Sequence, residues 1–203
     1  MTTIHLFRHG QTESNLAGRI QGHQNAPLTE LGIQQAIDAR QKIEGINFDV
    51  VLSSPSGRAV HTADLLIDGA PYPMQTYEGL REIYLGDWEG WLVEDIMQSH
   101  PEQFELFWSA PSRFVGGNGE SFARLKERAV ACLQEILSHH AGKTILVVSH
   151  AAFIKTLLTH LMGKGDDEVW HEPMANNLCH SIIRSDINGK VWVEKLCDVE
   201  LES

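Results

Sequence analysis

The sequence predicts an α/β fold in which a mostly parallel central sheet carries helices on both faces, with a small helical cap insertion and a possible antiparallel edge strand. Three observations predict it. Short apolar runs alternate with segments of helical periodicity along most of the chain. An aromatic-rich segment interrupts this alternation, and two late apolar runs flank an Asn-Gly pair. Strands that alternate with helices are typical of parallel sheets covered on both faces.

Five short apolar runs are the predicted strands. They cover residues 3–7, 48–52, 144–148, 180–184 and 191–196. The first three consist mainly of β-branched or aliphatic residues, which suits strands buried on both faces of a sheet. The last two flank residues 186–189, which end in an Asn-Gly hairpin signal. We therefore expect these two strands to pair antiparallel at one edge.

Four segments are the predicted helices of the main body. They cover residues 30–43, 59–67, 120–140 and 153–161. Thr29 is a suitable N-cap for the first, and Gly163 can end the last. In the third, apolar side chains recur at helical spacing over roughly five turns. Each of these helices follows or precedes a predicted strand, as a parallel sheet requires.

The segment from Trp88 to Phe114 differs in composition, since it holds six Trp or Phe residues and two prolines. We expect a cap of short helices inserted at about residues 88–118, with the glycine-rich residues 116–119 as its return hinge. Most of the aromatic side chains should pack the cap onto the sheet, and one or two should face a substrate. A chain of 203 residues can bury one core, so residues 1–203 are predicted to form a single domain with this insertion.

Charge restricts the class of partner. The chain carries 16 Lys and Arg against 27 Asp and Glu, a formal net charge of −11 at pH 7. Such a surface repels nucleic acid and anionic membranes, so neither is expected as a partner. The composition carries no signal for an oligomeric state. If the partner is a small anion, such as a phosphate monoester, its cationic ligands must be gathered at one place.

Other sequence signals concern location and cofactors. Cys132, Cys179 and Cys197 are too few and too widely spaced for a disulfide framework or a structural zinc site. We see no signal peptide at the start of the chain, and no apolar run approaches the ~18 residues of a membrane span. We therefore expect a cytoplasmic location. The P-loop and HExxH patterns are absent, and we expect no cofactor and no metal.

Basic and histidine side chains follow three of the predicted strands. Arg8 and His9 follow the first, Arg58 lies soon after the second, and His150 comes after the third. Because ligands bind beyond the carboxyl ends of parallel strands, we expect these side chains to converge there. Arginine binds phosphate oxygens in a planar fork, and helix N-termini add N–H donors. Gly10 allows close backbone approach beside His9. The sequence thus predicts a phosphate pocket.

The same residues lie in five blocks that resemble the motifs of the histidine phosphatase superfamily, the phosphoglycerate-mutase-like proteins. The blocks lie at residues 6–15, 21–32, 53–63, 80–90 and 147–150. The first contains the Arg-His-Gly signature, and the last contains the second histidine motif. The signature alone is weak evidence, whereas five blocks in this order are specific. The resemblance implies phosphohistidine chemistry that needs no metal.

The resemblance also implies roles for individual residues. His9 would be the nucleophile that attacks phosphorus and forms a covalent phosphohistidine. Arg8, Arg58 and His150 would bind the phosphoryl oxygens and stabilise the charge of the transition state. Glu82 would protonate the leaving oxygen and then deprotonate the attacking water.

Three further residues match positions of the family that contact the substrate. Asn15 would join the phosphoryl pocket, and Gln21 and Gly22 would also contact the substrate. The chemistry adds a physical expectation, because a nucleophilic imidazole must be neutral on the attacking nitrogen. The two neighbouring arginines should therefore lower the pKa of His9.

Within the superfamily, the block at residues 80–90 resembles the bacterial broad-specificity phosphatases. The predicted function is hydrolysis of small phosphomonoesters by a metal-independent histidine acid phosphatase. α-Ribazole phosphatase and phosphoglycerate mutase are the alternatives, and fructose-2,6-bisphosphatase-like activity is a further sister activity. The short interval before His150 and the short C-terminus favour a phosphatase over a mutase. A phosphate-binding module without activity would lack His9, Arg58 or Glu82, and all three are present.

Overall fold

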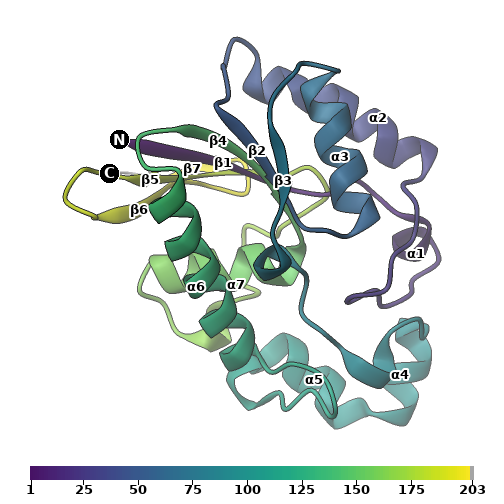
Figure 1. Cartoon of the computed structure of the whole chain (residues 1–203). Coiled ribbons are helices and arrows are strands. Elements are labelled where there is room, and N and C mark those ends of the chain that lie inside the picture. Colours follow the sequence, from purple (N-terminus) through teal and green to yellow (C-terminus); the bar gives the residue numbers. More distant parts are fainter. Residues whose placement is uncertain (202–203) are drawn as a thin grey trace.

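The structure of the protein is a computed structural model that describes residues 1–201. Its strands are β1 (Thr2–Arg8), β2 (Val50–Ser53), β3 (Met74–Thr76), β4 (Thr144–Ser149), β5 (His180–Ser185), β6 (Val191–Leu196) and β7 (Val199–Glu200). They form one seven-stranded sheet in the order β3-β2-β4-β1-β5-β6-β7 (Figure 1). The sheet is therefore the centre of the fold, with β1 and β4 in its middle.

The strand pairing confirms the predicted mixed sheet. β1, β2, β3 and β4 run parallel to one another, whereas β5, β6 and β7 pair antiparallel along one side. The hairpin between β5 and β6 turns where the Asn-Gly pair predicted it. Gly189 has a φ of 81° in this turn, a conformation that glycine adopts without strain.

The α-helices of the described chain are α1 (Glu13–Leu16), α2 (Glu30–Ala39), α3 (Gly57–Ile67), α4 (Val93–Ser99), α5 (Pro101–Ser109), α6 (Phe122–His139) and α7 (Ala151–Leu161). The predicted N-cap of α2 is confirmed, because Thr29 Oγ1 accepts a hydrogen bond from Gly32 N at 3.0 Å. Ser121 caps α6 in the same way, with Arg124 N as its donor.

Helices cover both faces of the sheet, as predicted. Neighbouring residues of β1 point to opposite faces, so Leu6 and Phe7 belong to different core clusters. Phe7 packs in the cluster that contains the buried apolar side chains of α2 and α3. Leu6 packs in the larger cluster that contains those of α6 and α7. The sheet is thus packed between two apolar layers, one on each face.

Several boundaries differ from the prediction. β2 begins at Val50 rather than at residue 48, and the preceding Asp49 instead accepts a hydrogen bond from Thr144 N at 2.8 Å. The helix predicted through residue 43 is α-helical only to Ala39 and ends in a 3₁₀ turn, Arg40–Ile43. Elements as short as α1, β3 and β7 were missed, because two to four residues show no periodicity.

The aromatic-rich segment folds into short helices, as predicted. α4, α5 and the 3₁₀ turn Pro111–Arg113 lie away from the sheet, at the bottom of Figure 1. Phe107 of α5 is buried and lies 5.2 Å, centroid to centroid, from both Phe114 and Phe122. Aromatic packing therefore joins this segment to α6. Its description as an insertion within one domain stays a prediction, and residues 202 and 203 lie outside the described residues.

Two further features concern the described chain as a whole. Within residues 1–201, no helix combines the length and apolar character needed to cross a membrane. Cys132, Cys179 and Cys197 are buried free thiols.

Candidate active site

Three neighbouring strands bring the predicted residues to one edge of the sheet. β4 lies between β1 and β2, so the residues that follow these strands meet. His9 N donates to Ser149 O at 3.1 Å, and Ser54 N donates to Val148 O at 2.9 Å. These main-chain bonds continue the pairing just beyond the strands. The chain is therefore still held in register where its polar side chains begin.

His9 is 3% exposed, and its protonation can be read from its contacts. Its Nδ1 lies 2.7 Å from Gly10 O. Because a carbonyl only accepts, Nδ1 carries the proton and Nε2 keeps its lone pair. Burial, and then the charges of Arg8 and Arg58, hold the pKa of His9 well below its ordinary value of 6.5. The ring is neutral at neutral pH. The arginines act as predicted, although burial is the larger cause.

Gly10 fixes the backbone beside His9. A Cβ atom at this position would lie 2.5 Å from Gly32 O on α2, which leaves no room for a side chain. Gly10 N also donates to Thr62 Oγ1 of α3 at 3.1 Å. The close backbone approach predicted here is an approach to α2, and it holds the His9 ring between two helices and the sheet.

Arg58 lies in the first turn of α3, is 1% exposed and contacts both histidines. Its Nε donates to His9 Nε2 at 3.3 Å, and Nη2 lies 3.1 Å from His150 Nδ1. Nη1 and Nη2 also donate to Gln24 O and Gly22 O at 2.6 and 2.8 Å. Burial lowers the pKa of Arg58 to about 10, so the group stays charged at neutral pH. A fixed positive charge therefore adjoins His9 Nε2.

His150 is fully buried, and both of its ring nitrogens are engaged. Since Arg58 only donates, Nδ1 accepts, and Nε2 carries the proton that it donates to Ser54 Oγ at 2.7 Å. Burial, followed by the Arg58 charge, holds the pKa of His150 well below 6.5. The neutral ring orients the Arg58 guanidinium. Its direct contact with phosphoryl oxygens stays a prediction.

Arg8, at the end of β1, has a donor that the protein leaves unused. Its Nη1 donates to Ala175 O at 2.8 Å. Its Nε is buried and has no hydrogen-bond partner within residues 1–201. A buried, charged N–H without an acceptor is unfavourable. This part of the site therefore favours an anion that supplies the missing acceptor.

The three residues predicted to contact the substrate line the same cavity. Asn15 Oδ1 accepts from Thr12 N at 3.1 Å, an interaction that engages the oxygen of the side chain rather than its amino group. Gln21 Oε1 is buried without a partner in the described chain. Gly22 has a φ of 52°, and its carbonyl accepts from Arg58. The segment that contains these residues therefore offers the amino group of Asn15 as a donor, and the carbonyl of Gly22 orients the arginine.

Glu82 lies on the other wall of this cavity. Its Oε1 accepts from Ile83 N and Phe153 N at 2.9 and 3.0 Å, and its Oε2 accepts from Ala152 N at 3.1 Å. Ala152 and Phe153 belong to the first turn of α7, where helices have free N–H groups. The carboxyl group is therefore anchored at a helix N-terminus next to the two arginines.

The cavity has a volume of about 260 Å³. Its polar lining comprises Arg8, His9, Asn15, Arg19, Gln21, Gly22, Arg58 and Glu82. Its apolar lining comprises Ile20, Ile83, Leu85, Val93, Phe107, Trp108 and Trp170. All predicted site residues except His150 thus line one cavity, and His150 contacts it through Arg58. This combination of polar and apolar side chains suits a ligand in which an anionic group is attached to an apolar one.

Comparison with known proteins identifies the family. The sequence model of the histidine phosphatase superfamily (branch 1) matches residues 4–198. The chain belongs to this superfamily. The matched range includes all five sequence blocks and the whole cavity, so the family assignment and the geometry concern the same residues.

Similar proteins of known name include several phosphatases. The chain is 34% identical over 185 residues to the adenosylcobalamin/alpha-ribazole phosphatase of Escherichia coli K12, covering 91% of this chain and 90% of that protein. It is 30% identical over 186 residues to phosphoserine phosphatase 1 of Hydrogenobacter thermophilus, covering 92% and 88%. The structure of Bacillus stearothermophilus YhfR superposes with a TM-score of 0.94 at 37% identity, covering 98% of both chains. These relatives support a phosphatase function.

Two residues of this histidine phosphatase were not singled out from the sequence. Arg19 is exposed, lines the cavity and donates to Gly90 O at 2.7 Å. Glu89 accepts from His23 N and Gln24 N at 2.7 and 3.2 Å, and so holds the loop that contains Gly22. Arg19 does not follow a predicted strand, so the sequence offered no signal for it. Glu89 lies in the sequence block at residues 80–90, which was the one available signal for it.

The charged groups that line the cavity of this histidine phosphatase are arginine and glutamate side chains. Arg8, Arg19 and Arg58 line it together with Glu82. In the described residues, no group of three or more His, Cys, Asp or Glu side chains is arranged to hold a metal ion. The donor set of the site therefore suits a phosphoryl group bound by guanidinium N–H groups.

Proposed function

We propose that this protein hydrolyses small phosphomonoesters through a covalent phosphohistidine intermediate at His9. The protonation and surroundings of His9 carry the proposal. Its ring is neutral, its Nε2 keeps the lone pair, and the charged groups of Arg8 and Arg58 lie beside it. Such a site attracts a phosphate ester and offers its phosphorus a nucleophile that needs no prior deprotonation.

The reaction has two steps. In the first, His9 Nε2 attacks phosphorus, a P–N bond forms, and the P–O bond to the leaving group breaks. The leaving oxygen takes a proton from the Glu82 carboxyl group. In the second, a water molecule gives a proton to the Glu82 carboxylate and attacks phosphorus, which breaks the P–N bond. Inorganic phosphate departs, and both residues return to their starting states.

The other predicted residues bind the phosphoryl group. Arg8 Nε, which lacks a protein acceptor, and the Arg58 guanidinium bind its oxygens and stabilise the charge of the transition state. Asn15 adds its amino group, and Gln21 contacts the substrate. His150 supports this group through Arg58, with which it is in contact.

The leaving group is proposed to have an apolar or aromatic part. Trp108 and Trp170 line the cavity with ring centroids 4.8 Å apart, beside Phe107. Trp170 Nε1 donates to Phe107 O at 2.6 Å, which fixes that indole ring. One or two aromatic residues were expected to face the substrate, and these are the candidates.

The proposed setting is the cytoplasm, and the proposed partner is a small molecule. Free, buried cysteines suit a reducing compartment. The net charge of −11 disfavours nucleic acid and anionic membranes as partners.

A panel of phosphomonoesters tests the proposal. p-Nitrophenyl phosphate reports the activity itself, and α-ribazole phosphate, phosphoserine and 3-phosphoglycerate compare leaving groups that the relatives suggest. We expect turnover of p-nitrophenyl phosphate, with a higher kcat/KM for esters that have an aromatic part than for phosphoserine. No turnover by folded, phosphate-free protein would instead support a module that only binds phosphate.

Turnover is expected to be independent of metal ions. Arg8 and Arg58 supply the positive charge that binds the phosphoryl group, so EDTA followed by dialysis should leave kcat within about twofold. The assay is p-nitrophenyl phosphate hydrolysis before and after treatment. A loss of activity that Mg²⁺ or Zn²⁺ restores would contradict this expectation.

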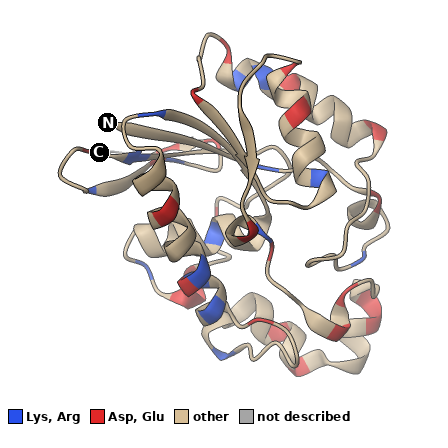
Figure 2. Ribbon diagram, viewed as in Figure 1, with Lys and Arg blue, Asp and Glu red and all other residues tan. Residues whose placement is uncertain are grey.

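Mutase activity is expected to be low. A mutase must keep its phosphohistidine away from water and hold a second anionic group, which requires cations near the cap. Figure 2 shows acidic residues on α4 and α5 instead, and Arg113 is the one Lys or Arg between residues 88 and 119. Arg113 is not among the cavity-lining residues, although Arg19 is. Water should therefore compete well for the phosphoryl group.

An enolase-coupled assay measures this balance. With 3-phosphoglycerate, primed by 2,3-bisphosphoglycerate, release of inorganic phosphate should exceed formation of 2-phosphoglycerate. Mutase turnover equal to or faster than phosphate release would replace the phosphatase assignment by the mutase alternative.

A further inference from the structure

Glu82 lies on a segment that has no regular secondary structure of its own. It lies between two 3₁₀ turns, Glu78–Leu80 and Gly86–Trp88, and no strand or helix ladder holds the residues from 81 to 85. A group that transfers a proton must be held within a fraction of an ångström of its productive position. Contacts from other elements must therefore position this carboxyl group.

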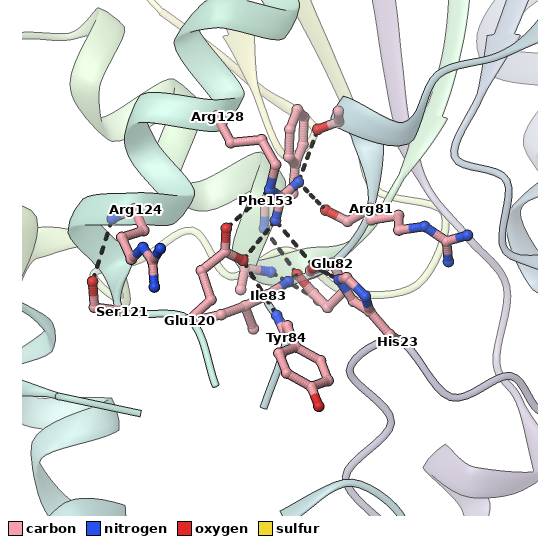
Figure 3. A network of polar contacts seen from close by, with 12 residues as sticks. His23, Arg81, Glu82, Ile83, Tyr84, Glu120, Ser121, Arg124, Arg128 and Phe153 are labelled. Carbon is pink, nitrogen blue, oxygen red and sulfur yellow. Dashed lines mark hydrogen bonds and ion pairs between the residues drawn. The ribbon is translucent and has the colours of Figure 1, made fainter. Parts of the chain in front are cut away.

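Arg128 of α6 supplies three hydrogen bonds to this part of the chain (Figure 3). Its Nη1 donates to Gly79 O and Arg81 O at 2.9 and 2.8 Å, and its Nη2 donates to Glu82 O at 3.1 Å. The remaining N–H groups form a two-point ion pair with Glu120, at 2.9 Å from Nε and 2.7 Å from Nη2. All five guanidinium N–H groups are thus used within the protein.

Glu120 holds the same segment from its other end. Its Oε2 also accepts from Tyr84 N at 3.2 Å, and Glu120 N donates to Tyr84 O at 2.6 Å. Together the Arg128–Glu120 pair binds the main chain on both sides of Glu82. The pair is partly shielded from solvent, with side-chain exposures of 25% and 14%.

His23, which follows the cavity-lining residues Gln21 and Gly22, adds one more contact. Its Nε2 donates to Glu82 O at 2.9 Å, so this carbonyl accepts from both His23 and Arg128. The side chain of Glu82 is engaged with α7 instead, through Ala152 N and Phe153 N. Glu82 is thus fixed at its carbonyl by α6 and at its carboxyl by α7.

We propose that Arg128, held by Glu120, is a positioning residue that sets the Glu82 carboxyl at the leaving oxygen. It does not line the active-site cavity. Its one contact with Glu82 is to the main-chain carbonyl, and it also binds the main chain of Gly79 and Arg81. This inference rests on the proposed function, because it requires Glu82 to be the proton donor.

The test is Arg128→Met, assayed with an alkyl phosphate and with p-nitrophenyl phosphate. An alkoxide is a poor leaving group that needs the proton, so kcat for the alkyl ester should fall by about 10- to 100-fold. p-Nitrophenolate leaves readily without a proton, so kcat for its ester should fall by less than about fivefold. In a Glu82→Gln background, Arg128→Met should cause no further selective loss.

Two companion variants keep the test decisive. Arg124→Met removes an exposed arginine one turn away on α6, whose side chain does not bond to Glu82, and should leave both activities unchanged. His23→Ala removes only one of the two donors to Glu82 O, and should give a smaller loss with the same preference for the alkyl ester. Thermal unfolding of each variant shows whether a loss of activity reflects lost positioning or lost folding. If Arg128→Met does not fold, His23→Ala tests whether anchoring of the Glu82 carbonyl affects the alkyl ester selectively.

The outcomes separate the inference from the function on which it rests. Equal losses on both esters in Arg128→Met, with a selective loss in Glu82→Gln, would overturn the positioning role alone. Equal losses in Glu82→Gln would overturn the proton-donor role, and the positioning role with it. If Arg128→Met caused a further loss for the alkyl ester in the Glu82→Gln background, the positioning role would also be overturned. Arg128 would then act independently of Glu82.

Discussion

Replacing His9 by alanine is expected to lower kcat for every phosphomonoester by about 10⁴-fold or more, the scale at which loss of a covalent nucleophile acts. The physical reason is the geometry of one nitrogen atom. Nδ1 is protonated and bonded to Gly10 O, so Nε2 is the atom available for attack. No other imidazole nitrogen lines the cavity in the described part of the chain, since His150 lies outside the lining.

The matched control for this variant is His61→Ala. His61 is an exposed histidine on α3, one turn beyond Arg58, and its removal should leave kcat unchanged. Circular dichroism and thermal unfolding should confirm that His9→Ala is folded, because His9 is buried. Residual activity of His9→Ala within about tenfold of the unmodified protein would contradict the assignment of the nucleophile.

Glu82→Gln is expected to have the second-largest effect, and that effect should depend on the leaving group. For alkyl phosphates kcat should fall by about 10²- to 10⁴-fold, the range that general acid catalysis supplies. For p-nitrophenyl phosphate the fall should be far smaller, because p-nitrophenolate is stable without a proton. Glutamine has the size of glutamate, and its Oε1 can still accept hydrogen bonds from Ile83 N and Phe153 N, so the substitution removes the transferable proton together with the one hydrogen bond from Ala152 N.

Glu78→Gln is the control for charge in the same segment. Glu78 is exposed and pairs with Arg81, so its replacement should leave both activities unchanged. Losses of equal size for the two esters in Glu82→Gln would indicate that Glu82 positions the substrate or the water rather than donating a proton.

The part of the site that lies at strand ends was predictable from the sequence. Arg8, His9 and Arg58 each follow a short apolar run, and the topology of a parallel sheet brings such positions together. The protonation of His9 was predictable in direction from its charged neighbours. Its burial was not, because burial depends on how Gly10 packs against α2.

The residues that support Glu82 were not predictable. Arg128 lies on the long amphipathic helix α6, where an isolated arginine is ordinarily a solvated surface residue. Its function depends on contacts with an irregular segment more than 40 positions earlier in the chain, such as the 46-residue separation from Glu82. Hydrophobic periodicity places helices and strands but carries no information about the partners of polar groups in loops.

The cap aromatics were predictable as a group but not one by one. Their composition indicates packing, and Phe107 and Phe114 are buried as expected. The contact of Trp108 with Trp170 joins the cap to the segment after α7, far away in the sequence. Only the folded chain shows which of these rings lie at the cavity.

The most direct test of the central claim is to trap the covalent intermediate. The protein is mixed briefly with a phosphate-labelled ester, quenched, and analysed for label bound to the chain. The account predicts label on His9, stable in base and labile in acid, as a phosphorus–nitrogen bond requires, and no label on His9→Ala. Label that is stable in acid, or label that persists in His9→Ala, would contradict it.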